Sequence, residues 1–518
     1  MTKKTLYPVL ALLLGSMMPR PSLAQTDTAR LQGTVVDSSG GAVAGAIITV
    51  TSKDTAREAK AETNGDGSYV VPALPAGHYT ESVEKRGFEK VVRSFELQIS
   101  QVGVLDFTLQ VGSTSQSVNV AGESPVIDAA DSAIGTVIEG KQVTELPLNG
   151  RNFTQLATLV PGVTRGIPTG TATGSQNNAE TFRNGSSGGA SLAVNGLRPQ
   201  ANNFTFDGID NNESLVNTIV FFPPADAIEE FRVQTSVATA EYGRAGGGIV
   251  ATSLKSGTNG FHGSAFWFHR DQTLDALPFF ATSQSSFSRN QFGGSVGGPI
   301  IKNKLFFFGD YQGLRLKQPG QPEFATVPTD NMRKGDFSEL LCGTCTNTGL
   351  GAPIAIIDPT TGLQFMGNGA QPNVIPANRT NMVGLNYIKA FPEPNCDHSI
   401  SPNCDSILHN YTNVRDLIEN WNDFDIRIDY LHDANNQIFG RFSRGRADQT
   451  LTTRLSTLPS GFGSGTNFNH PYGASLGWTH TFSPQVINEA RYGFVRTSYG
   501  YTPPGEGEQI CVELGIPN

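Results

Sequence analysis

Apolar and polar residues alternate along most of the chain, but the alternating stretches differ in length between its two ends. Between Ala29 and Gln110 they are short and are separated by Gly, Pro and Asp, as in "LQGTVVD", "GAIITVTS", "GSYVVPAL", "GHYTESV" and "VLDFTLQ". Short strands punctuated by turn residues predict a small β-sandwich, which we place at residues 27–112.

After Gly260 the alternating segments become longer and richer in aromatic residues. In "DFDIRIDYLH", Phe424, Ile426, Ile428 and Tyr430 fall on one face of the predicted strand, and Asp423, Asp425, Arg427 and Asp429 fall on the other. A strand of a soluble sandwich alternates in the same way. The number of such segments, each about ten residues long, and their aromatic content favour a transmembrane β-barrel. They are "FHGSAFWFHR", "NQFGGSVGGPI", "NKLFFFGDYQGLRLK", "NQIFGRFSRG", "YGASLGWTHTF" and "INEARYGFVRTSYG".

Between these two regions, residues 125–255 combine short strands, many glycines and two brief helices, which predicts a compact α+β unit. One helix is expected in "NGRNFTQLATLVPGV", with Asn152 as its cap and Pro161-Gly162 at its end. Its apolar face comprises Phe153, Leu156, Ala157 and Val160. A helix this short is unstable alone in water, so this face must pack on another surface.

The strand pattern fades at residues 319–420, which are rich in Pro, Asn and Gly and hold four of the five cysteines. We expect a long outer loop with two local disulfides, Cys342 with Cys345 and Cys396 with Cys404. The Cys-x-x-Cys spacing also occurs in zinc sites, but a second ligand pair at the required spacing is missing. The spacing therefore favours disulfides.

The N-terminus and the charge balance bear on location and partners. Lys3 and Lys4 precede an apolar run and then Ser22-Leu23-Ala24, which predicts a secretory signal peptide at residues 1–24. A retained membrane anchor is the alternative, although the apolar run is shorter than the ~20 residues of a spanning helix. The 46 acidic residues outnumber the 37 basic ones, which argues against nucleic acid as a partner.

Three motifs suggest a metal or a nucleophile, but their surroundings do not support either. His78 and Glu81 are three apart on a predicted strand and so face opposite sides. The "GSSGG" at residues 185–189 lacks the strand and helix that flank a nucleophile elbow. Asp207, Asp210 and Glu213 do not have the spacing of a calcium loop. We therefore expect no catalytic residues, no metal and no cofactor, and we do not expect an enzyme.

The order of motifs in the sandwich resembles that of the carboxypeptidase regulatory-like, transthyretin-like domain. The matching stretches are G-x-V-x-D from Gly33, G-A-x-I-x-V from Gly45, T-x-x-x-G-x-Y from Thr63, L-P-A-G-x-Y from Leu74 and Gly87-Phe88. Domains of this class are noncatalytic. The resemblance covers about 80 residues of the chain.

Nearly the whole chain resembles Oar-like TonB-dependent outer-membrane receptors that carry such an N-terminal domain. The residues that carry the resemblance are "ELPLNGRNFTQLATLVPGV", "VNGLRPQANNFTFDGIDNNE", "IEEFRVQTSVATAEYGRAGGGIVATSLKSGTNGFHGSAFWFHR" and "GGSVGGPIIKNKLFFFGDYQGLR". The resemblance implies a mainly β protein with a sandwich, a plug at residues 125–255 and the first part of a barrel at residues 256–518. In such receptors the short helix packs on a small sheet of the plug, inside the barrel.

The family resemblance also implies partners and a function. A TonB box, which pairs with a TonB-type energy-coupling protein, would lie in the linker at residues 113–124, at Ser117, Val118, Asn119, Val120, Ala121 and Gly122. Asn119 departs from the more apolar family pattern, and a plain linker is the alternative. Other positions resemble plug residues that seat the plug against the barrel, although solvated surface charge would explain them equally: Arg151, Arg198, Arg232, Arg244, Asp207, Asp210, Glu229 and Glu230.

We expect location in the outer membrane of a Gram-negative-type bacterium, with lipid around the barrel. The function implied is energy-coupled uptake of a large ligand, which would be a carbohydrate, a peptide or a metal chelate. The alternative is surface binding or a secretion-related role without active uptake. Residues 256–518, less the long loop, supply only about seven or eight strands at ~20–25 residues each. Such a barrel is too narrow for a plug, and the aromatic terminal residue of the class is missing, so we expect the N-terminal part of a longer protein.

Overall fold

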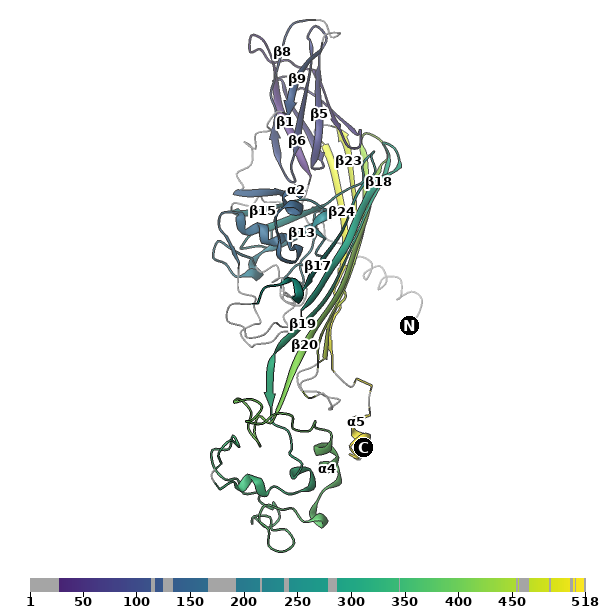
Figure 1. The fold of residues 1–518 in the computed structure, drawn as a ribbon. Coiled ribbons are helices and arrows are strands. Elements are labelled where there is room, and N and C mark those ends of the chain that lie inside the picture. Colours follow the sequence, from purple (N-terminus) through teal and green to yellow (C-terminus); the bar gives the residue numbers. More distant parts are fainter. Residues whose placement is uncertain are drawn as a thin grey trace, which may run out of the picture.

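The protein has three parts along its length, with a further loop unit at one end (Figure 1). A computed structural model describes residues 28–112, 117–123, 134–165, 192–214, 217–236, 242–277, 287–343, 345–452, 455, 465–483, 486–503, 506–507 and 509–516. The expected signal peptide and the "GSSGG" of residues 185–189 lie outside these residues. The sandwich lies at one end, and a curved wall of long strands runs along one side of the plug.

The N-terminal part is a β-sandwich, as predicted. One sheet has the order β4-β1-β7 with β8 beside β1, and the other has the order β3-β2-β5-β6-β9. The strands are β1 (Ala29–Asp37), β2 (Ile47–Ser52), β3 (Glu58–Glu62), β4 (Ser68–Leu74), β5 (Gly77–Glu84), β6 (Lys90–Leu97), β7 (Val102–Val104), β8 (Phe107–Leu109) and β9 (Ser117–Glu123). The linker expected at residues 113–124 is therefore in part a strand of the sandwich.

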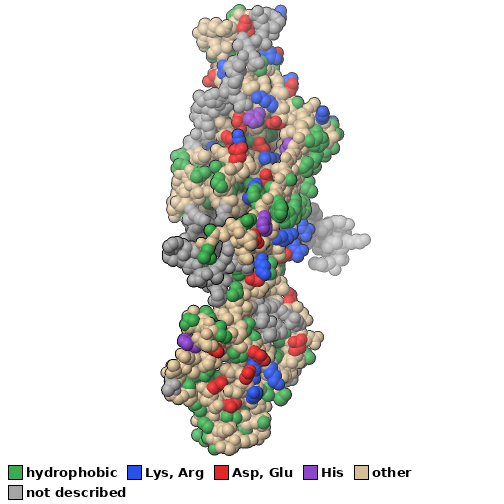
Figure 2. Space-filling model, viewed as in Figure 1, with side chains coloured by type: hydrophobic (Ala, Val, Ile, Leu, Met, Phe, Trp, Pro, Cys, Tyr) green, Lys and Arg blue, Asp and Glu red, His purple; other side chains and the backbone are tan. Residues whose placement is uncertain are grey.

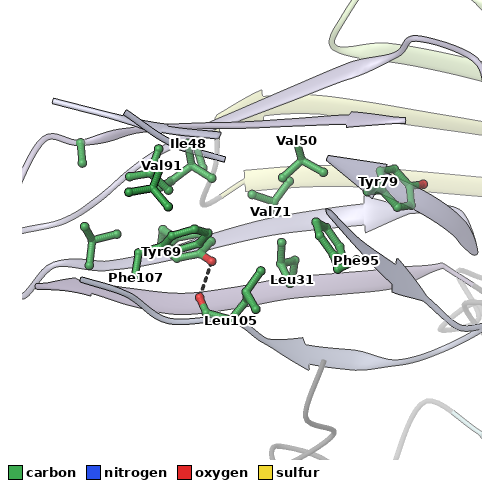
Figure 3. Packing of buried hydrophobic residues seen from close by; sticks show 14 of the residues in the cluster. Leu31, Ile48, Val50, Tyr69, Val71, Tyr79, Val91, Phe95, Leu105 and Phe107 are labelled. Carbon is green, nitrogen blue, oxygen red and sulfur yellow. Dashed lines mark hydrogen bonds between the residues drawn. The ribbon is translucent and has the colours of Figure 1, made fainter. Parts of the chain in front are cut away.

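The core of the sandwich lies between its two sheets (Figure 3). Leu31, Ile48 and Phe95 are fully buried there, and the Tyr69 hydroxyl donates a hydrogen bond to the Leu105 carbonyl at 2.6 Å. The same alternation that predicted the strands puts these side chains inward. His78 is exposed while Glu81 is buried, so the two residues face opposite sides of β5, as expected.

The plug is built on a five-stranded sheet with the order β10-β15-β16-β13-β14, beside a two-stranded ribbon of β11 and β12. Its elements are β10 (Ile134–Glu139), α2 (Gly140–Glu145), η1 (Asn149–Arg151), η2 (Phe153–Leu159), β11 (Val163–Arg165), β12 (Leu192–Val194), η5 (Pro199–Ala201), β13 (Asn203–Phe206), β14 (Ile209–Asp210), η6 (Ala225–Ala227), β15 (Ile228–Ser236) and β16 (Ile249–Leu254).

The expected short helix is present as η2, which is a 3₁₀ helix. The Asn152 side chain caps it by accepting a hydrogen bond from the Thr154 amide at 3.0 Å. All four residues of the expected apolar face are buried: Phe153, Leu156, Ala157 and Val160. The Phe153 ring meets Phe231 of β15 edge-on, with ring centroids 5.3 Å apart. The surface that this helix needs is thus the plug sheet.

The C-terminal wall is a nine-stranded antiparallel sheet. Its elements are β17 (His262–Asp271), η7 (Gln272–Leu274), β18 (Ser288–Ile301), β19 (Leu305–Ala325), β20 (Tyr411–Leu431), β21 (Asn436–Leu451), β22 (Gly465–Asn469), β23 (Tyr472–Ser483), β24 (Val486–Arg496) and β25 (Tyr499–Thr502). Among the described strands, β17 pairs only with β18, and β24 pairs only with β23, so the sheet is not closed.

The two faces of β20 follow the predicted alternation. Ile426 and Ile428 are 48% and 37% exposed, whereas Asp425 and Asp429, on the face toward the plug, are only 4% and 5% exposed. Phe439 and Phe442 of β21 also lie on opposite faces, because Phe439 contacts Arg427 while Phe442 is 40% exposed. Figure 2 shows hydrophobic side chains gathered along the outer side of the wall. Among the described residues, no helix is both long and apolar enough to cross a membrane.

The long outer loop begins later and ends earlier than residues 319–420, and this boundary was wrong. β19 and β20 continue to pair up to Ala325 and Tyr411, with a register shift between Pro319 and Pro322. The strands absorb these prolines through that irregularity, which the composition did not reveal. The loop contains η8 (Met332–Lys334), η9 (Ser338–Leu341), η10 (Ala377–Arg379) and α4 (Met382–Lys389), and α5 (Ile510–Glu513) lies near the end of the chain.

Candidate functional site

The plug meets the wall at a tight turn between β13 and β14. Asp207 and Gly208 are its two central residues, with φ of 49° and 70°, as a two-residue hairpin of the type I′ class requires. Asp-Gly is a favoured sequence for this turn, because glycine adopts positive φ without strain and aspartate tolerates it. The turn pushes the Asp207 side chain out of the plug sheet and toward the wall.

Asp207 is bound by arginines from three strands of the wall. Its Oδ1 accepts from Arg427 Nη1 and its Oδ2 from Arg441 Nη1, each at 2.9 Å. Its backbone carbonyl accepts from Arg491 Nη1 at 3.1 Å. We call Arg427, Arg441 and Arg491 the wall arginines. The Asp207 side chain is 0% exposed, so these hydrogen bonds form away from bulk water, where they are strong.

The wall arginines are themselves held in place by further contacts. Arg427 also binds Asp429 at 3.0 Å, and Arg491 binds Glu489. The Arg441 guanidinium stacks on the Phe206 ring of the plug, 3.5 Å from its centroid. A buried charge is tolerated only when it is paired and hydrogen-bonded, and this cluster meets that condition with carboxylates from both parts.

A second contact joins the plug to the first strand of the wall. The Arg151 guanidinium pairs with Asp226 inside the plug and lies over the rings of Phe266 and Phe268, 4.5 and 4.9 Å from their centroids. The wall also approaches the plug closely at Gly493, where an added Cβ would lie 2.3 Å from Ile209 Cγ2. A cavity of about 380 Å³ separates residues 143–148 of the plug from Phe268, Arg270 and Arg289.

The sandwich contacts both the plug and the wall. Its contacts with the wall lie at the end of the wall where short turns join β18 to β19 and β20 to β21. Residues 98–101, between β6 and β7, lie against β15: the Ile99 amide donates to the Glu230 carboxylate, and Arg232 Nη1 donates to the Ser100 carbonyl at 2.7 Å. Burial raises the pKa of Glu230 well above its usual value. Arg57 Nη1 donates to Gln437 Oε1 of the wall at 2.6 Å. A cavity of about 530 Å³ lies where the three parts meet.

The plug residues proposed from the resemblance therefore separate into different roles. Asp207 and Arg151 contact the wall, whereas Glu230 and Arg232 contact the sandwich. Arg244 and Asp210 pair with each other at 2.7 Å in an exposed position, and Arg198 is exposed. Glu229 lines the cavity where the three parts meet, and burial there raises its pKa. For Arg198, Arg244 and Asp210, solvated surface charge is the better interpretation.

The sequence did not indicate the wall arginines as partners of the plug. Its alternation did predict that Arg427 faces inward with Asp425 and Asp429, but not which plug residue it meets. Arg441 lies in a segment whose alternation is weak. The segment of Arg491 alternates, with Glu489 and Arg491 on one face and Tyr492 and Phe494 on the other, but the alternation does not identify a plug partner. An arginine at an inward position of a barrel strand was the available signal, because a charge there needs a partner on the plug.

The candidate TonB box, residues Ser117 to Gly122, lies in β9. β9 pairs in parallel with β6, and the first pair joins Ser117 to Lys90.

The loop cysteines form two local disulfides, Cys342 with Cys345 and Cys396 with Cys404, and Cys511 is free and exposed. No group of His, Cys, Asp and Glu suited to a metal occurs among the residues that the structure describes.

Comparison with known proteins gives three domain matches. Residues 30–110 match a carboxypeptidase regulatory-like domain, residues 128–250 a TonB-dependent receptor plug domain, and residues 253–518 an outer membrane beta barrel domain. The TonB-dependent transporter Oar of Myxococcus xanthus is 25% identical over 315 residues, which are 57% of this chain and 27% of that protein. The chain thus spans about a quarter of that relative's length.

Two solved structures are similar in part. The outer-membrane transporter YddB of Escherichia coli is 10% identical with a TM-score of 0.42, over 72% of this chain and 39% of that one. The siderophore receptor PirA of Acinetobacter baumannii is 14% identical with a TM-score of 0.37, over 70% and 40%. The barrel match covers half of the chain, which places it in the outer membrane. The chain belongs to the outer membrane beta barrel domain family and carries a carboxypeptidase regulatory-like domain and a TonB-dependent receptor plug ahead of its barrel strands.

Proposed function

We propose that this chain belongs to a TonB-dependent outer-membrane receptor that takes up a large ligand. The observation that carries the proposal is the attachment of the plug to the wall by Asp207 and the wall arginines. Separation of a buried charge from its partners is costly, so this cluster holds the plug in the wall at rest, and displacement of the plug would need an energy source such as a pull on its N-terminal end. The relationship to a TonB-dependent transporter supports the same function.

The energy would come from a TonB-type periplasmic protein that pairs with Ser117 to Gly122 by β-augmentation. Backbone N–H and C=O groups provide most of such a contact, so side-chain departures such as Asn119 are tolerated. The ligand would be a carbohydrate, a peptide or a metal chelate, bound on the side of the long loop. Lipid would surround the outward face of the wall, where Ile426 and Ile428 are exposed.

Substitutions in the candidate TonB box test this function in the full-length protein in cells. Val118→Pro with Val120→Pro removes two backbone donors, so we expect loss of uptake of labelled oligosaccharides, peptides or iron chelates while surface binding remains. Val118→Ala with Val120→Ala keeps both donors and should retain most uptake. Uptake that is unchanged in the proline variant would contradict the proposal.

The alternative is a surface-binding or secretion-related role without active uptake. It is favoured by the size of the loop unit at residues 326–410, which has a buried cluster of its own around Leu340. In that case a probe would bind at the surface of wild-type cells and would never enter, and the proline variant would behave like the wild type.

A further inference from the structure

The stretch proposed as the TonB box is already a strand in this structure. β9 pairs in parallel with β6 through Lys90 with Ser117, Val91 with Val118, Val92 with Asn119 and Arg93 with Val120. A register shift follows, and Ser94 then pairs with Glu123. β9 is thereby the last strand of the sheet β3-β2-β5-β6-β9 (Figure 1).

A strand has two edges, and β6 occupies only one edge of β9. At the other edge, none of the strands that the structure describes pairs with β9. The backbone N–H and C=O groups of a free edge form a template for a strand from another chain. Pairing with β6 therefore does not hide β9 from a partner that binds by strand addition.

Pairing with β6 also prepares β9 for binding. A free linker must lose backbone entropy when it becomes extended on a partner, whereas β9 is extended before the partner arrives. Preorganisation of this kind raises affinity by lowering the cost of binding. The same residues in an unpaired linker would bind the partner more weakly.

The sandwich also connects β9 to the plug by a second route besides the chain itself. β6 ends at Leu97, and the next residues contact β15 of the plug through Ile99 with Glu230 and Ser100 with Arg232. A load applied to β9 thus reaches the plug sheet through β6 and residues 98–101.

We propose that the sandwich is the platform on which the TonB box is presented: an extended strand of the energising protein adds to the free edge of β9 while β9 stays paired with β6. This inference rests on the proposed function, since it assigns the form in which the same segment is recognised. The competing arrangement is masking, in which β9 must leave β6 before the partner binds.

A disulfide between β9 and β6 separates the two arrangements. Val92→Cys with Asn119→Cys joins paired positions, and neighbouring strands are about 4.8 Å apart, within the range that a disulfide spans. The variant is made in the full-length protein with Cys511→Ser, and binding of the purified periplasmic domain of the TonB-type protein is measured with and without reductant. Val92→Cys alone is the matched control.

We expect the oxidised variant to bind within about threefold of its reduced form. A loss of tenfold or more that reductant reverses would overturn the platform and leave the proposed function standing. Failure of the wild type and of every variant to bind would overturn both.

Hydrogen exchange on the wild-type complex gives a second readout without any substitution. If the partner adds to β9 in place, the amides of Lys90–Leu97 stay as protected as in the free receptor, and those of Ser117–Glu123 become more protected. Faster exchange in β6 on binding would mean that the partner strips β9 from the sandwich and would overturn the platform.

Discussion

Asp207 of the plug and Arg441 of the wall face each other at 2.9 Å, with side chains that are 0% and 4% exposed. Their hydrogen bond is part of a cluster in which one plug carboxylate satisfies two arginines from neighbouring strands. Asp207 Oδ1 also accepts from the Leu254 amide at 3.0 Å, which ties the turn to the strand that leads into the wall. One side chain thus joins the last strand of the plug sheet to two strands of the wall.

Asp207→Asn should loosen the plug without unfolding the wall. The amide has nearly the same shape but lacks the charge that compensates the wall arginines, and removal of one partner of a buried ion pair costs about 3–5 kcal/mol. We expect faster proteolysis of residues 192–254 in the detergent-solubilised full-length protein. Asp210→Asn is the matched control, because its pair with Arg244 is exposed and is worth less than about 1 kcal/mol.

Phe153→Ala should destabilise the plug from within. Phe153 is 1% exposed and packs against Phe231 and Phe222, so its truncation opens a cavity at a cost of about 3–5 kcal/mol. Leu159 lies in the same 3₁₀ helix but is 70% exposed, and Leu159→Ala should change stability by less than about 0.5 kcal/mol. Hydrogen exchange in β15 distinguishes the two, and equal effects would contradict the packing described here.

The sandwich should become less stable as the pH rises, because of Glu81. This carboxyl is 0% exposed, and burial raises its pKa from the usual 4.5 to about 8, an effect that Arg93 opposite it on β6 partly offsets. The folded domain therefore holds a proton that the unfolded chain releases above pH 4.5. The stability that protonated Glu81 contributes is complete below about pH 4.5. As the pH rises from about 4.5 to about 8, this contribution falls by close to 1.4 kcal/mol per pH unit and is then lost.

Urea unfolding of a fragment with residues 28–123, followed by circular dichroism at several pH values, measures this dependence. Glu81→Gln keeps a neutral side chain of similar size at every pH. We expect it to flatten the dependence between pH 5 and 8 and to be more stable than the wild type at pH 8. A slope that is the same in both proteins would assign the effect to another group.

The fold was predictable wherever a repeating pattern reports on one buried face. The sandwich strands, the inward face of β20 and the apolar face of η2 all follow from local periodicity, since each pattern is set by which side chains leave water. The strand extension of β19 and β20 past Pro319 was not predictable in this way, because the pairing that overrides the prolines joins residues about a hundred positions apart.

The contacts of the site were predictable only in part, for the same reason. Asp207 could be recognised as a turn residue, but its partners Arg427, Arg441 and Arg491 come from three strands that are distant in sequence. The strand formed by Ser117 to Glu123 shows the converse: its apolar–polar alternation is limited to Val118, Asn119 and Val120, and its pairing depends on the edge that β6 offers. Tertiary contacts decide both features.

Removal of the Cys396–Cys404 disulfide should loosen the loop unit alone. Both cysteines are buried, and closure of a loop of this length is worth about 2–3 kcal/mol in the unfolded-chain model. Cys396→Ala with Cys404→Ala should increase protease cleavage within residues 326–410 and leave the plug and the wall unchanged. Cys511→Ser, which removes an exposed free thiol, should have no effect in the same assay.

Two isoleucines with the same exposure should respond differently to charge if lipid surrounds the wall. Ile426 of β20 is 48% exposed and lies five residues before the end of its strand, roughly 16 Å along it, whereas Ile354 of the loop unit is 46% exposed. In water, arginine at either position would change stability by less than about 0.5 kcal/mol. In lipid, Ile426→Arg should cost about 2–4 kcal/mol, because the charge must be desolvated near the middle of the membrane.

We therefore expect Ile426→Arg to reduce the amount of folded full-length protein in outer membranes and Ile354→Arg to leave it unchanged. Equal amounts of the two variants would mean that water, and not lipid, contacts the outer face of β20.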